Sequence, residues 1–583
     1  MKIVLQHVTK RDWLFLAISF IFIISQIWLD LKIPEFMSEI TRLIQTPGSE
    51  LQPVLTSGFY MLLCALGSMA AAIFTGFFIA KIAVGVSMRL RASIFDKTLD
   101  FSTAELNKFS TASLITRCTN DVTQIQTLVA MGLQTFIKAP ILAVWAITKI
   151  SSSASAWTIT TAITVVLIVI ILASAIAVVY PKTIRLQKLT DQLNRIAREH
   201  LMGLRVIRAY NAENFQAENF EEANSELTNT NLAINRTMAF LTPVLTSVSS
   251  GLSLAIYAVG AFLIQDAVGP DKLNLFSDMI VMSSYAMQVV FSFIMLVFTF
   301  IMLPRAVVSL RRITEVLTTP LSIPNGTKTV GTESGTIEFD NVSFSYPDAE
   351  EAVLENISFS AKKGETVAFI GATGAGKTTL LQMIPRFYDA TTGSVRVDGV
   401  DVKEYDVHAL RNRMSYITQK SILFSGTITD NIAYGDNGQG EITAEAIKKA
   451  AEISQASDFI AQKEGQYDAH VAQGGSNFSG GQKQRLSIAR AVARDPQIYL
   501  FDDSFSALDY KTDKVLRHAL RDAAKDATLL IVAQRIGTIR NADKIIVLDD
   551  GKAVGIGTHS QLLADCPVYR EIAQSQLSEE ELV

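Results

Sequence analysis

Residues 366–379 read TVAFIGATGAGKTT, and this stretch decides the fold of the C-terminal half. Its first five residues are β-branched or apolar, which predicts a strand. The glycines that follow fit the pattern Gly371-x-x-x-x-Gly376-Lys377-Thr378, a P-loop between a strand and a helix. Such a loop turns backbone N–H groups toward phosphate oxygens at the positive end of a helix. The alternative, a glycine turn that binds nothing, is disfavoured by the flanking strand and helix.

The segment QIYLFDD at 497–503 supplies a second part of a phosphate site. An apolar strand here delivers Asp502 beside the P-loop, where its carboxylate can hold Mg²⁺ through water. Lys377 would reach the β- and γ-phosphates, and the Thr378 hydroxyl would ligate Mg²⁺. The alternative is an ordinary buried strand that ends in an acidic turn. More β-branched runs alternate with helical segments, which predicts an α/β P-loop NTPase domain with a mainly parallel sheet.

A second glycine motif, Ser479-Gly480-Gly481-Gln482, opens the helical segment that precedes Asp502. It predicts another phosphate-binding helix N-terminus. Because the P-loop already supplies a phosphate cradle, we expect this motif to close on the nucleotide of another molecule. ATP would then lie between two such domains. The alternative is a glycine-containing N-cap on a surface helix.

The N-terminal half has a different pattern, because it contains six apolar stretches. Four of them can cover the ~20 residues of a membrane-spanning helix, and two weaker stretches, 13–29 and 122–148, complete the set. The six stretches are 13–29, 51–80, 122–148, 150–181, 237–265 and 279–304, and only 122–148 contains a charge. The sequence therefore predicts an all-α polytopic membrane domain of six transmembrane helices extending into the cytoplasm.

The composition supports this division and excludes other classes. The 583 residues are 49% hydrophobic and 19% charged, which argues against a wholly soluble protein. A net charge of -4 disfavours a nucleic-acid binder. Three separated cysteines and six scattered histidines form no disulfide framework and no metal motif.

Basic residues flank one end of the apolar stretches, and the opposite loops carry few. By the positive-inside rule, both termini and the nucleotide-binding domain are predicted in the cytoplasm, with the chain multi-pass in the cell membrane. The polar connections after 80 and 181 are predicted to be helices that continue out of the bilayer, with breaks at 101–110 and near Gly203. A Pro-, Gly- and Thr-rich segment predicts the boundaries: a membrane domain at 1–318, a linker at 319–335 and a nucleotide-binding domain at 336–583.

Taken together, these motifs resemble those of ATP-binding cassette (ABC) half-transporters with exporter-type membrane domains. The resemblance implies ATP and Mg²⁺ as ligands and a membrane lipid environment. It assigns nucleotide contacts to Tyr346, Gly371, Thr373, Gly374, Ala375, Gly376, Lys377, Thr378, Thr379 and Gln419, and Mg²⁺ contacts to Thr378, Gln419 and Asp502. It assigns the catalytic positions to Asp503 and Gln534, the signature motif that faces the partner's ATP to Phe478, Ser479, Gly480, Gly481 and Gln482, and the D-loop to Asp509.

Two departures from the family pattern concern hydrolysis. Asp503 stands where the family usually has glutamate, and Gln534 stands where it usually has histidine. The shorter carboxylate should fall short of the attacking water, and losing a general base typically costs 10²–10⁴-fold. The chain therefore resembles the degenerate-site subunit of bacterial heterodimeric multidrug exporters, whose partner is a second, different half-transporter.

The resemblance implies ATP-driven export of small amphipathic compounds. The alternatives are a lipid or peptide exporter, an exporter-fold siderophore importer subunit, and a non-pumping sensor subunit. Lys138 is the candidate residue for a substrate cavity, since a charge at membrane depth costs ~2.5–3.5 kcal/mol and usually faces a cavity or a partner. It could instead pair with an acid of the other subunit or extend to the membrane interface.

Overall fold

The computed structural model describes residues 2–46, 50–151, 155–267, 271–347, 349–435, 438 and 440–577. It divides into two compact units, each with its own hydrophobic core. The first unit comprises Met1–Leu99 and Thr111–Thr319, and the second comprises Asp100–Ser110 and Pro320–Val583. The short segment Asp100–Ser110 groups with the C-terminal unit although the sequence around it continues the membrane helices.

The first unit is entirely helical in its described residues. Its helices are α1 (Lys2–Gln6), α2 (Lys10–Gln45), α3 (Leu51–Leu99), α5 (Thr111–Thr116), α6 (Val122–Thr127), α7 (Leu133–Ser151), α8 (Ser155–Met202), α9 (Leu204–Ala209), α10 (Glu213–Asp266) and α11 (Asp271–Thr318). Two π-helical segments, η1 (Arg117–Asp121) and η2 (Leu128–Gly132), join α5, α6 and α7 into one rod. With Thr111–Ser151 counted as one helix, six helices in the described residues are long and apolar enough to cross a membrane. This confirms the six predicted spans.

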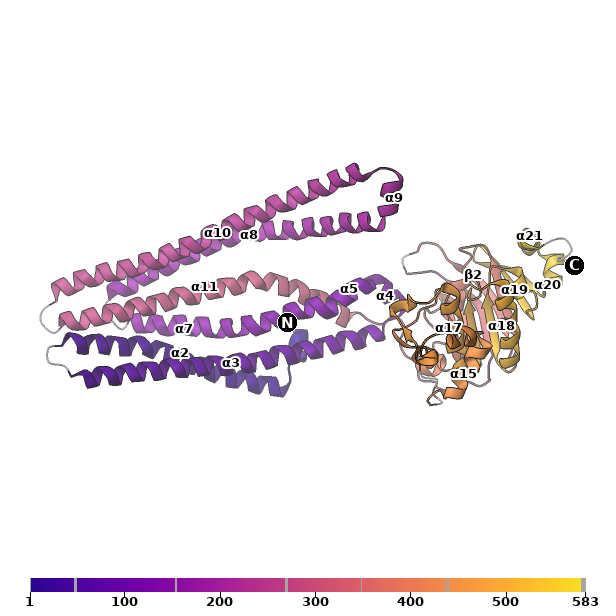
Figure 1. Ribbon diagram of the computed structural model, residues 1–583, viewed down its shortest axis with the longest axis horizontal. Helices are drawn as coiled ribbons and strands as arrows, with labels where there is room; N and C mark the ends of the chain where they lie inside the picture. Colours follow the sequence, from indigo (N-terminus) through magenta and orange to yellow (C-terminus); the bar gives the residue numbers. More distant parts are fainter. Residues whose placement is uncertain are drawn as a thin grey trace. The chain divides into compact units, whose positions relative to one another are not determined.

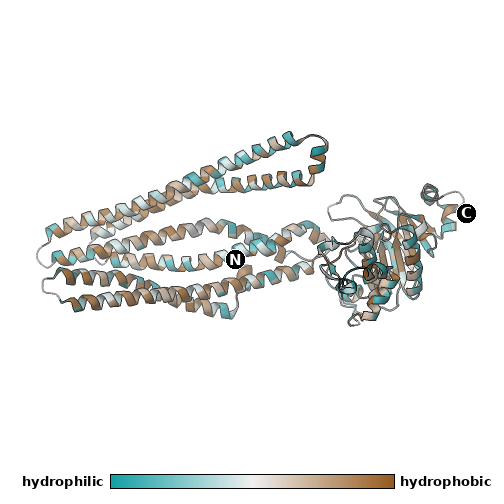
Figure 2. Ribbon diagram, viewed as in Figure 1, coloured by the Kyte–Doolittle hydropathy of each residue, from teal (hydrophilic) through white to brown (hydrophobic). Residues whose placement is uncertain are grey.

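The long helices extend past their apolar stretches, as predicted. α8 and α10 lie side by side and are joined by the short helix α9 (Figure 1). Figure 2 shows hydrophobic colour along most of both helices and more hydrophilic colour toward α9. The turn begins at Gly203, whose φ of -90° and ψ of 7° end the regular helix. Buried apolar side chains from α2, α7, α8, α10 and α11 form the core of this unit.

The second unit contains two principal sheets. Its strands are β1 (Ile337–Phe344), β2 (Leu354–Ala361), β3 (Thr366–Gly371), β4 (Thr392–Val397), β5 (Val400–Asp401), β6 (Met414–Ile417), β7 (Gly426–Thr427), β8 (His470–Val471), β9 (Ile498–Asp502), β10 (Thr528–Val532), β11 (Lys544–Asp549) and β12 (Lys552–Gly557). A four-stranded antiparallel sheet has the order β2-β1-β4-β5, and a six-stranded sheet has the order β12-β11-β3-β10-β9-β6. The six-stranded sheet is parallel except for β12, which confirms the predicted fold class.

The strand order places the two predicted phosphate elements close together. β10 lies between β3 and β9, with Val532 paired to Phe369 on one side and to Asp502 on the other. Because parallel strands end at the same edge of a sheet, the P-loop and Asp502 emerge together.

Helices cover this sheet and form a smaller group beside it. They are α4 (Thr103–Phe109), α12 (Lys377–Met383), α13 (Val407–Arg411), α14 (Ile428–Ile432), α15 (Ala444–Ile453), α16 (Ser457–Ala461), α17 (Gly480–Ala493), α18 (Tyr510–Ala523), α19 (Ile536–Ile539), α20 (His559–Asp565) and α21 (Pro567–Gln576). α14 to α17 share a separate apolar cluster, which supports the N-terminus of α17 independently of the main sheet.

Candidate nucleotide-binding site

The loop between β3 and α12 is shaped by its glycines. Gly376 has a φ of 88°, and a Cβ there would lie 2.6 Å from Leu354 Cδ2 and 2.9 Å from Val353 O. Gly374 has a φ of 91°, and the space where its Cβ would lie is open. The bare backbone leaves a cavity of about 340 Å³ in front of the loop. The cavity is lined by Tyr346, Val353, Thr373, Gly374, Gly376, Lys377, Thr378, Thr379, Gln419, Asp502, Asp503, Val532 and Gln534.

Lys377 folds back over this loop. Its Nζ donates to the carbonyl oxygens of Gly371 at 2.9 Å and Ala372 at 2.7 Å, and the residue is 9% exposed. Burial lowers the pKa of Lys377, and the nearby charges of Asp503 and Asp502 oppose that effect. A lysine held above a ring of backbone N–H groups can bind phosphate oxygens.

Asp502 ends β9 beside the first turn of α12. Its Oδ1 accepts a hydrogen bond from Thr378 Oγ1 at 2.8 Å, and its Oδ2 accepts one from Tyr416 OH at 3.0 Å. Burial raises the pKa of Asp502, while the bonds from Thr378 and Tyr416 favour its ionised form. A hydroxyl beside a carboxylate is a donor set that suits Mg²⁺. Tyr416 was not singled out from the sequence, and its only signal is its place on β6 before Gln419.

Asp503 receives amide donors from two other segments. Its Oδ2 accepts from Gln534 Nε2 at 3.0 Å and from Gln419 Nε2 at 3.3 Å. The residue is 8% exposed and has a left-handed φ of 48°. Burial raises the pKa of Asp503, and the bond from Gln419 opposes this. The structure therefore brings two amides from distant parts of the sequence to one carboxylate oxygen of Asp503.

Tyr346 forms an aromatic wall of the cavity. Its hydroxyl lies 2.9 Å from Thr379 Oγ1, and its ring meets those of Phe344 and Tyr388 edge-on, at centroid distances of 4.9 and 5.3 Å. The ring is half-buried, and an exposed aromatic face of this kind can stack on a base.

Comparisons with known proteins agree with this geometry. The family model for ABC transporters matches residues 354–506, and the model for the ABC transporter transmembrane region matches residues 16–293. An uncharacterized ABC transporter ATP-binding protein of Mycobacterium tuberculosis is 40% identical over 88% of this chain and 86% of its own length. The chain belongs to the ABC transporter family. Such a chain binds ATP and couples ATP hydrolysis to transport.

Two further relatives refine the comparison. An ATP-dependent lipid A-core flippase of Pseudomonas fluorescens is 30% identical over 85% of this chain and 81% of its own. The structure of a bacterial Atm1-family ABC exporter with ATP bound has a TM-score of 0.83 at 23% identity, covering 98% of this chain and 100% of that one. The ABC exporter fold expected from the sequence is therefore confirmed.

In this ABC transporter the signature residues lie away from the nucleotide cavity. None of the described residues that line the cavity comes from 478–482. Ser479 caps α17, since its Oγ accepts from Gln482 N at 3.3 Å while Gln482 Oε1 accepts from Ser479 N at 3.0 Å. Phe478 is buried among the side chains of the α14–α17 group. The prediction that this motif opens a helix is confirmed, since α17 begins at Gly480, and Ser479 and Gly480 are exposed in the chain.

Gly371, Ala375 and Asp509 are not among the described residues that line the cavity. Gly371 and Ala375 belong to the loop, and Ala375 is buried. Asp509 caps α18 by accepting from Thr512 N at 2.9 Å. That backbone bond is the main reason that the pKa of Asp509 lies below its ordinary value.

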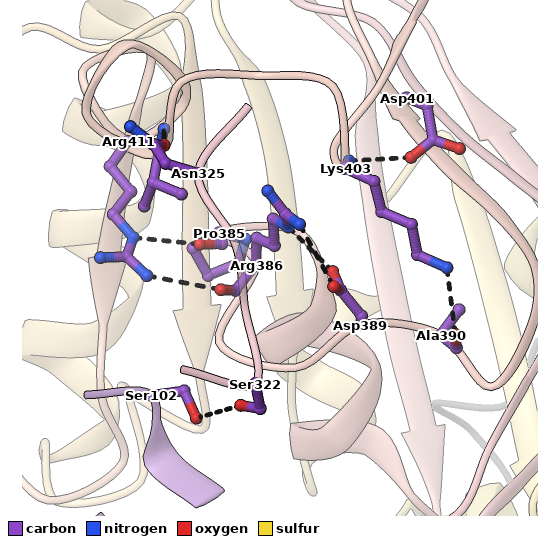
Figure 3. Close-up of polar contacts among 11 residues, drawn as sticks. Ser102, Ser322, Asn325, Pro385, Arg386, Asp389, Ala390, Asp401, Lys403 and Arg411 are labelled. Carbon is purple, nitrogen blue, oxygen red and sulfur yellow. Dashed lines mark hydrogen bonds and ion pairs between the residues drawn. The ribbon is translucent and has the colours of Figure 1, made fainter. Parts of the chain in front are cut away.

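The segment Asp100–Ser110 docks α4 onto the nucleotide domain. Glu105 Oε2 accepts from Ser102 N at 2.7 Å, while its Oε1 accepts from Ser322 N at 2.9 Å. Figure 3 shows the hydroxyls of Ser102 and Ser322 meeting at 2.9 Å. Burial raises the pKa of Glu105, but the hydrogen bonds from Ser102 and Ser322 outweigh it and hold the pKa below its ordinary value.

Tyr388 connects α4 to the aromatic wall. Its side chain hydrogen-bonds to Thr103 of α4, and its ring packs against Tyr346. Arg411 donates to the carbonyl oxygens of Pro385 at 3.1 Å and Arg386 at 3.4 Å, which fixes the turn before Tyr388 (Figure 3). Tyr388 thus contacts both the docked helix and Tyr346, which lines the cavity.

Lys138 lies on α7, and its Nζ is 3.5 Å from Asp30 Oδ2 on α2. Asp30 also accepts a hydrogen bond from Ser68 on α3. The acid beside Lys138 therefore comes from the same chain, a pairing that was not among the three alternatives considered from the sequence. Lys138 is not among the described residues that line the large cavity of the membrane unit.

Proposed function

We propose that this ABC exporter is one half of a heterodimer that exports small amphipathic compounds and that its own ATP site hydrolyses slowly. The observation that carries the proposal is the environment of Asp503. This short carboxylate is 8% exposed, and the same oxygen accepts hydrogen bonds from Gln419 and Gln534. A general base must reach the proton that it abstracts, and both amides compete for that oxygen.

Gln534 adds a second reason for slow hydrolysis. An amide can donate one hydrogen bond to a γ-phosphate, but it cannot carry the positive charge of a protonated histidine. Its Nε2 already donates to Asp503. We therefore expect ATP to bind at this site and to leave it slowly, while a different half-transporter supplies a site with glutamate and histidine.

ATP binding is assigned to the residues of the cavity. Lys377 and the N–H groups of residues 373–379 hold the phosphates, and the Tyr346 ring stacks on the base. Thr378, Asp502 and Gln419 would hold Mg²⁺, which when bound neutralises phosphate charge. Residues 478–482 and Asp509 then complete the partner's site, which fits the position of the signature residues away from the cavity of their own chain.

The proposed outward direction of transport rests on the resemblance to exporters, and the orientation of the chain is compatible with it. The basic ends of the spans favour a cytoplasmic nucleotide domain. Closure of two such domains around ATP would move the extended helices and turn the membrane cavity outward. The lipid A-core flippases among the relatives favour a lipid as a second candidate substrate.

Uptake into inverted membrane vesicles tests the function. Vesicles that contain this chain and its partner should accumulate a fluorescent amphipathic dye when ATP is present, and the partner's glutamate should be required. Movement of labelled lipid between leaflets without dye uptake would favour the lipid candidate. ATP-driven loss of dye from the vesicles would mean import and would contradict the proposal.

A further inference from the structure

The membrane unit contains a large cavity of about 930 Å³ between the α6–η2 segment, α8, α10 and α11. This volume lies within the range of about 300–1,000 Å³ that holds one small ligand. Most of the lining is aliphatic and comes from all four elements. It includes Leu128, Leu172, Val179, Leu241, Val297 and Val308.

The lining of the cavity continues past the ends of the apolar stretches, into the parts of the helices where the first charged residues lie. On α8 its lining runs from Leu172 to Gln187, which passes Lys182, the first charge after the apolar stretch. On α10 the lining runs across Arg236, and on α11 it runs across Arg305. One end therefore lies at hydrocarbon depth and the other at the head-group level, where the first charges of membrane helices lie.

The polar end of the cavity is positively charged. Arg305 is exposed and lines the cavity, and no acidic residue is among the described lining residues. In the part of the chain that the structure describes, Arg305 has no ion pair. Asp121 contacts other side chains of α11, the helix that carries Arg305, because its Oδ2 lies 3.3 Å from Arg312 Nε and its Oδ1 accepts from Ser309 Oγ at 2.8 Å.

We propose that this cavity binds a single-chain anionic amphiphile drawn from the surrounding lipid leaflet, with its head on Arg305 and its chain along the aliphatic lining. Guanidinium groups form strong paired hydrogen bonds with carboxylates and phosphates. A neutral or cationic amphiphile would leave Arg305 without a counter-charge beside a low-dielectric wall. This inference rests on the proposed export of amphipathic compounds, and it adds that the compound bound in this cavity is anionic.

Photolabelling of the assembled transporter tests the inference. The complex is placed in nanodiscs of zwitterionic lipid and exposed to a photoreactive C16 carboxylate or to the matched C16 alcohol. We expect the carboxylate to label peptides of α8 and α11 saturably, with about tenfold higher affinity than the alcohol. Arg305→Gln should reduce carboxylate affinity about tenfold to hundredfold and leave the alcohol unchanged, since a charged hydrogen bond is lost.

Two variants control for charge and folding. Arg305→Lys keeps the charge and should retain most of the binding. Arg311→Gln removes an exposed charge from the same helix outside the cavity and should leave the affinity for the carboxylate probe unchanged. Equal labelling by both probes, or an unchanged Arg305→Gln protein, would overturn the inference. Labelling of the isolated chain but not of the complex would mean that helices of the partner fill the cavity, which would also overturn it.

Dye transport separates this inference from the proposed function. If ATP-driven uptake of a neutral dye persists but the carboxylate does not bind at Arg305, only the inference fails. If the carboxylate binds at Arg305 but no amphiphile moves with ATP, the cavity assignment stands and the proposed function fails.

Discussion

Single residues decide what the nucleotide site can do. The glycine loop and the hydrogen-bonded pair of Asp502 and Thr378 are the residues that we propose to hold phosphate and Mg²⁺. Asp503 and Gln534 are the two departures of this chain from the family pattern that concern hydrolysis. In the structure Gln534 Nε2 donates a hydrogen bond to Asp503 Oδ2 at 3.0 Å. The sequence identified both residues as departures from the family pattern. It gave no sign that Gln419 would donate to the same oxygen, because that contact depends on how β6, β9 and β10 align.

Lys377→Met should weaken ATP binding about tenfold to hundredfold, because a charged hydrogen bond is worth about 1.5–3 kcal/mol. Binding of a fluorescent ATP analogue to the purified chain measures this change. Lys511→Met, at an exposed position on α18, is the matched control and should bind as the unmodified chain does. Equal affinities for the two variants would contradict the assignment of Lys377 to phosphate.

Glu105→Gln should destabilise the docking of α4 most at neutral pH. The folded pKa of Glu105 lies below its ordinary value of 4.5. Its stabilising contribution is therefore present above that value and is lost as pH falls through the folded pKa. We expect the variant to lose about 1.5–3 kcal/mol at pH 7 and less below pH ~4. Thermal unfolding at the two pH values measures the difference.

The control for this change is Glu404→Gln. Glu404 is exposed and pairs only with Lys328 among the described residues, so its loss should cost little at either pH. A difference between Glu105→Gln and the unmodified chain that stays constant down to pH 3.5 would argue against the role of the ionised carboxylate.

Among the elements, those with strong periodic or apolar signals were predictable. The six spans and the strands β3, β9, β10 and β11 follow directly from apolar runs. In the antiparallel sheet, β4 was expected from the run SVRVDG at 394–399, but β1 and β2 were missed. Register shifts along β1 interrupt the alternation of apolar and polar residues that would have indicated a strand. The docking of α4 could not be predicted from the sequence either, because it depends on contacts with Ser322 and Tyr388, which lie far along the chain.

Tyr388→Phe should uncouple α4 from the nucleotide site without weakening ATP binding. The change removes the hydrogen bond to Thr103 and keeps the ring against Tyr346. A net hydrogen bond is worth about 0.5–1.5 kcal/mol, so we expect about a twofold to tenfold loss in the stimulation of ATPase activity by amphiphiles. ATPase assays of the assembled transporter with and without dye measure it.

Thr103→Ala should have the same effect, and the double variant should add nothing, because both changes remove one interaction. Additive losses, or a loss of ATP affinity in Tyr388→Phe, would mean that the two residues act separately.

At the scale of the whole molecule, the chain is an ABC exporter half-transporter, and residues 478–482 are not among the described residues that line its nucleotide cavity. In the proposed heterodimer, a second nucleotide domain would complete each site. Family and fold class were predictable from motifs. The identity of the second subunit was not, because the surfaces that select it are not encoded in any short motif.

The steady-state ATPase activity of this chain alone, compared with the chain co-assembled with a half-transporter whose own site has glutamate and histidine, tests the central claim most directly. Asp503→Glu with Gln534→His is measured in parallel. We predict slow turnover for the chain alone, a rise of about 10²-fold or more in the double variant, and fast turnover in the pair that depends on the partner's glutamate. Fast turnover by the unmodified chain alone would show that Asp503 and Gln534 are competent and would contradict the account.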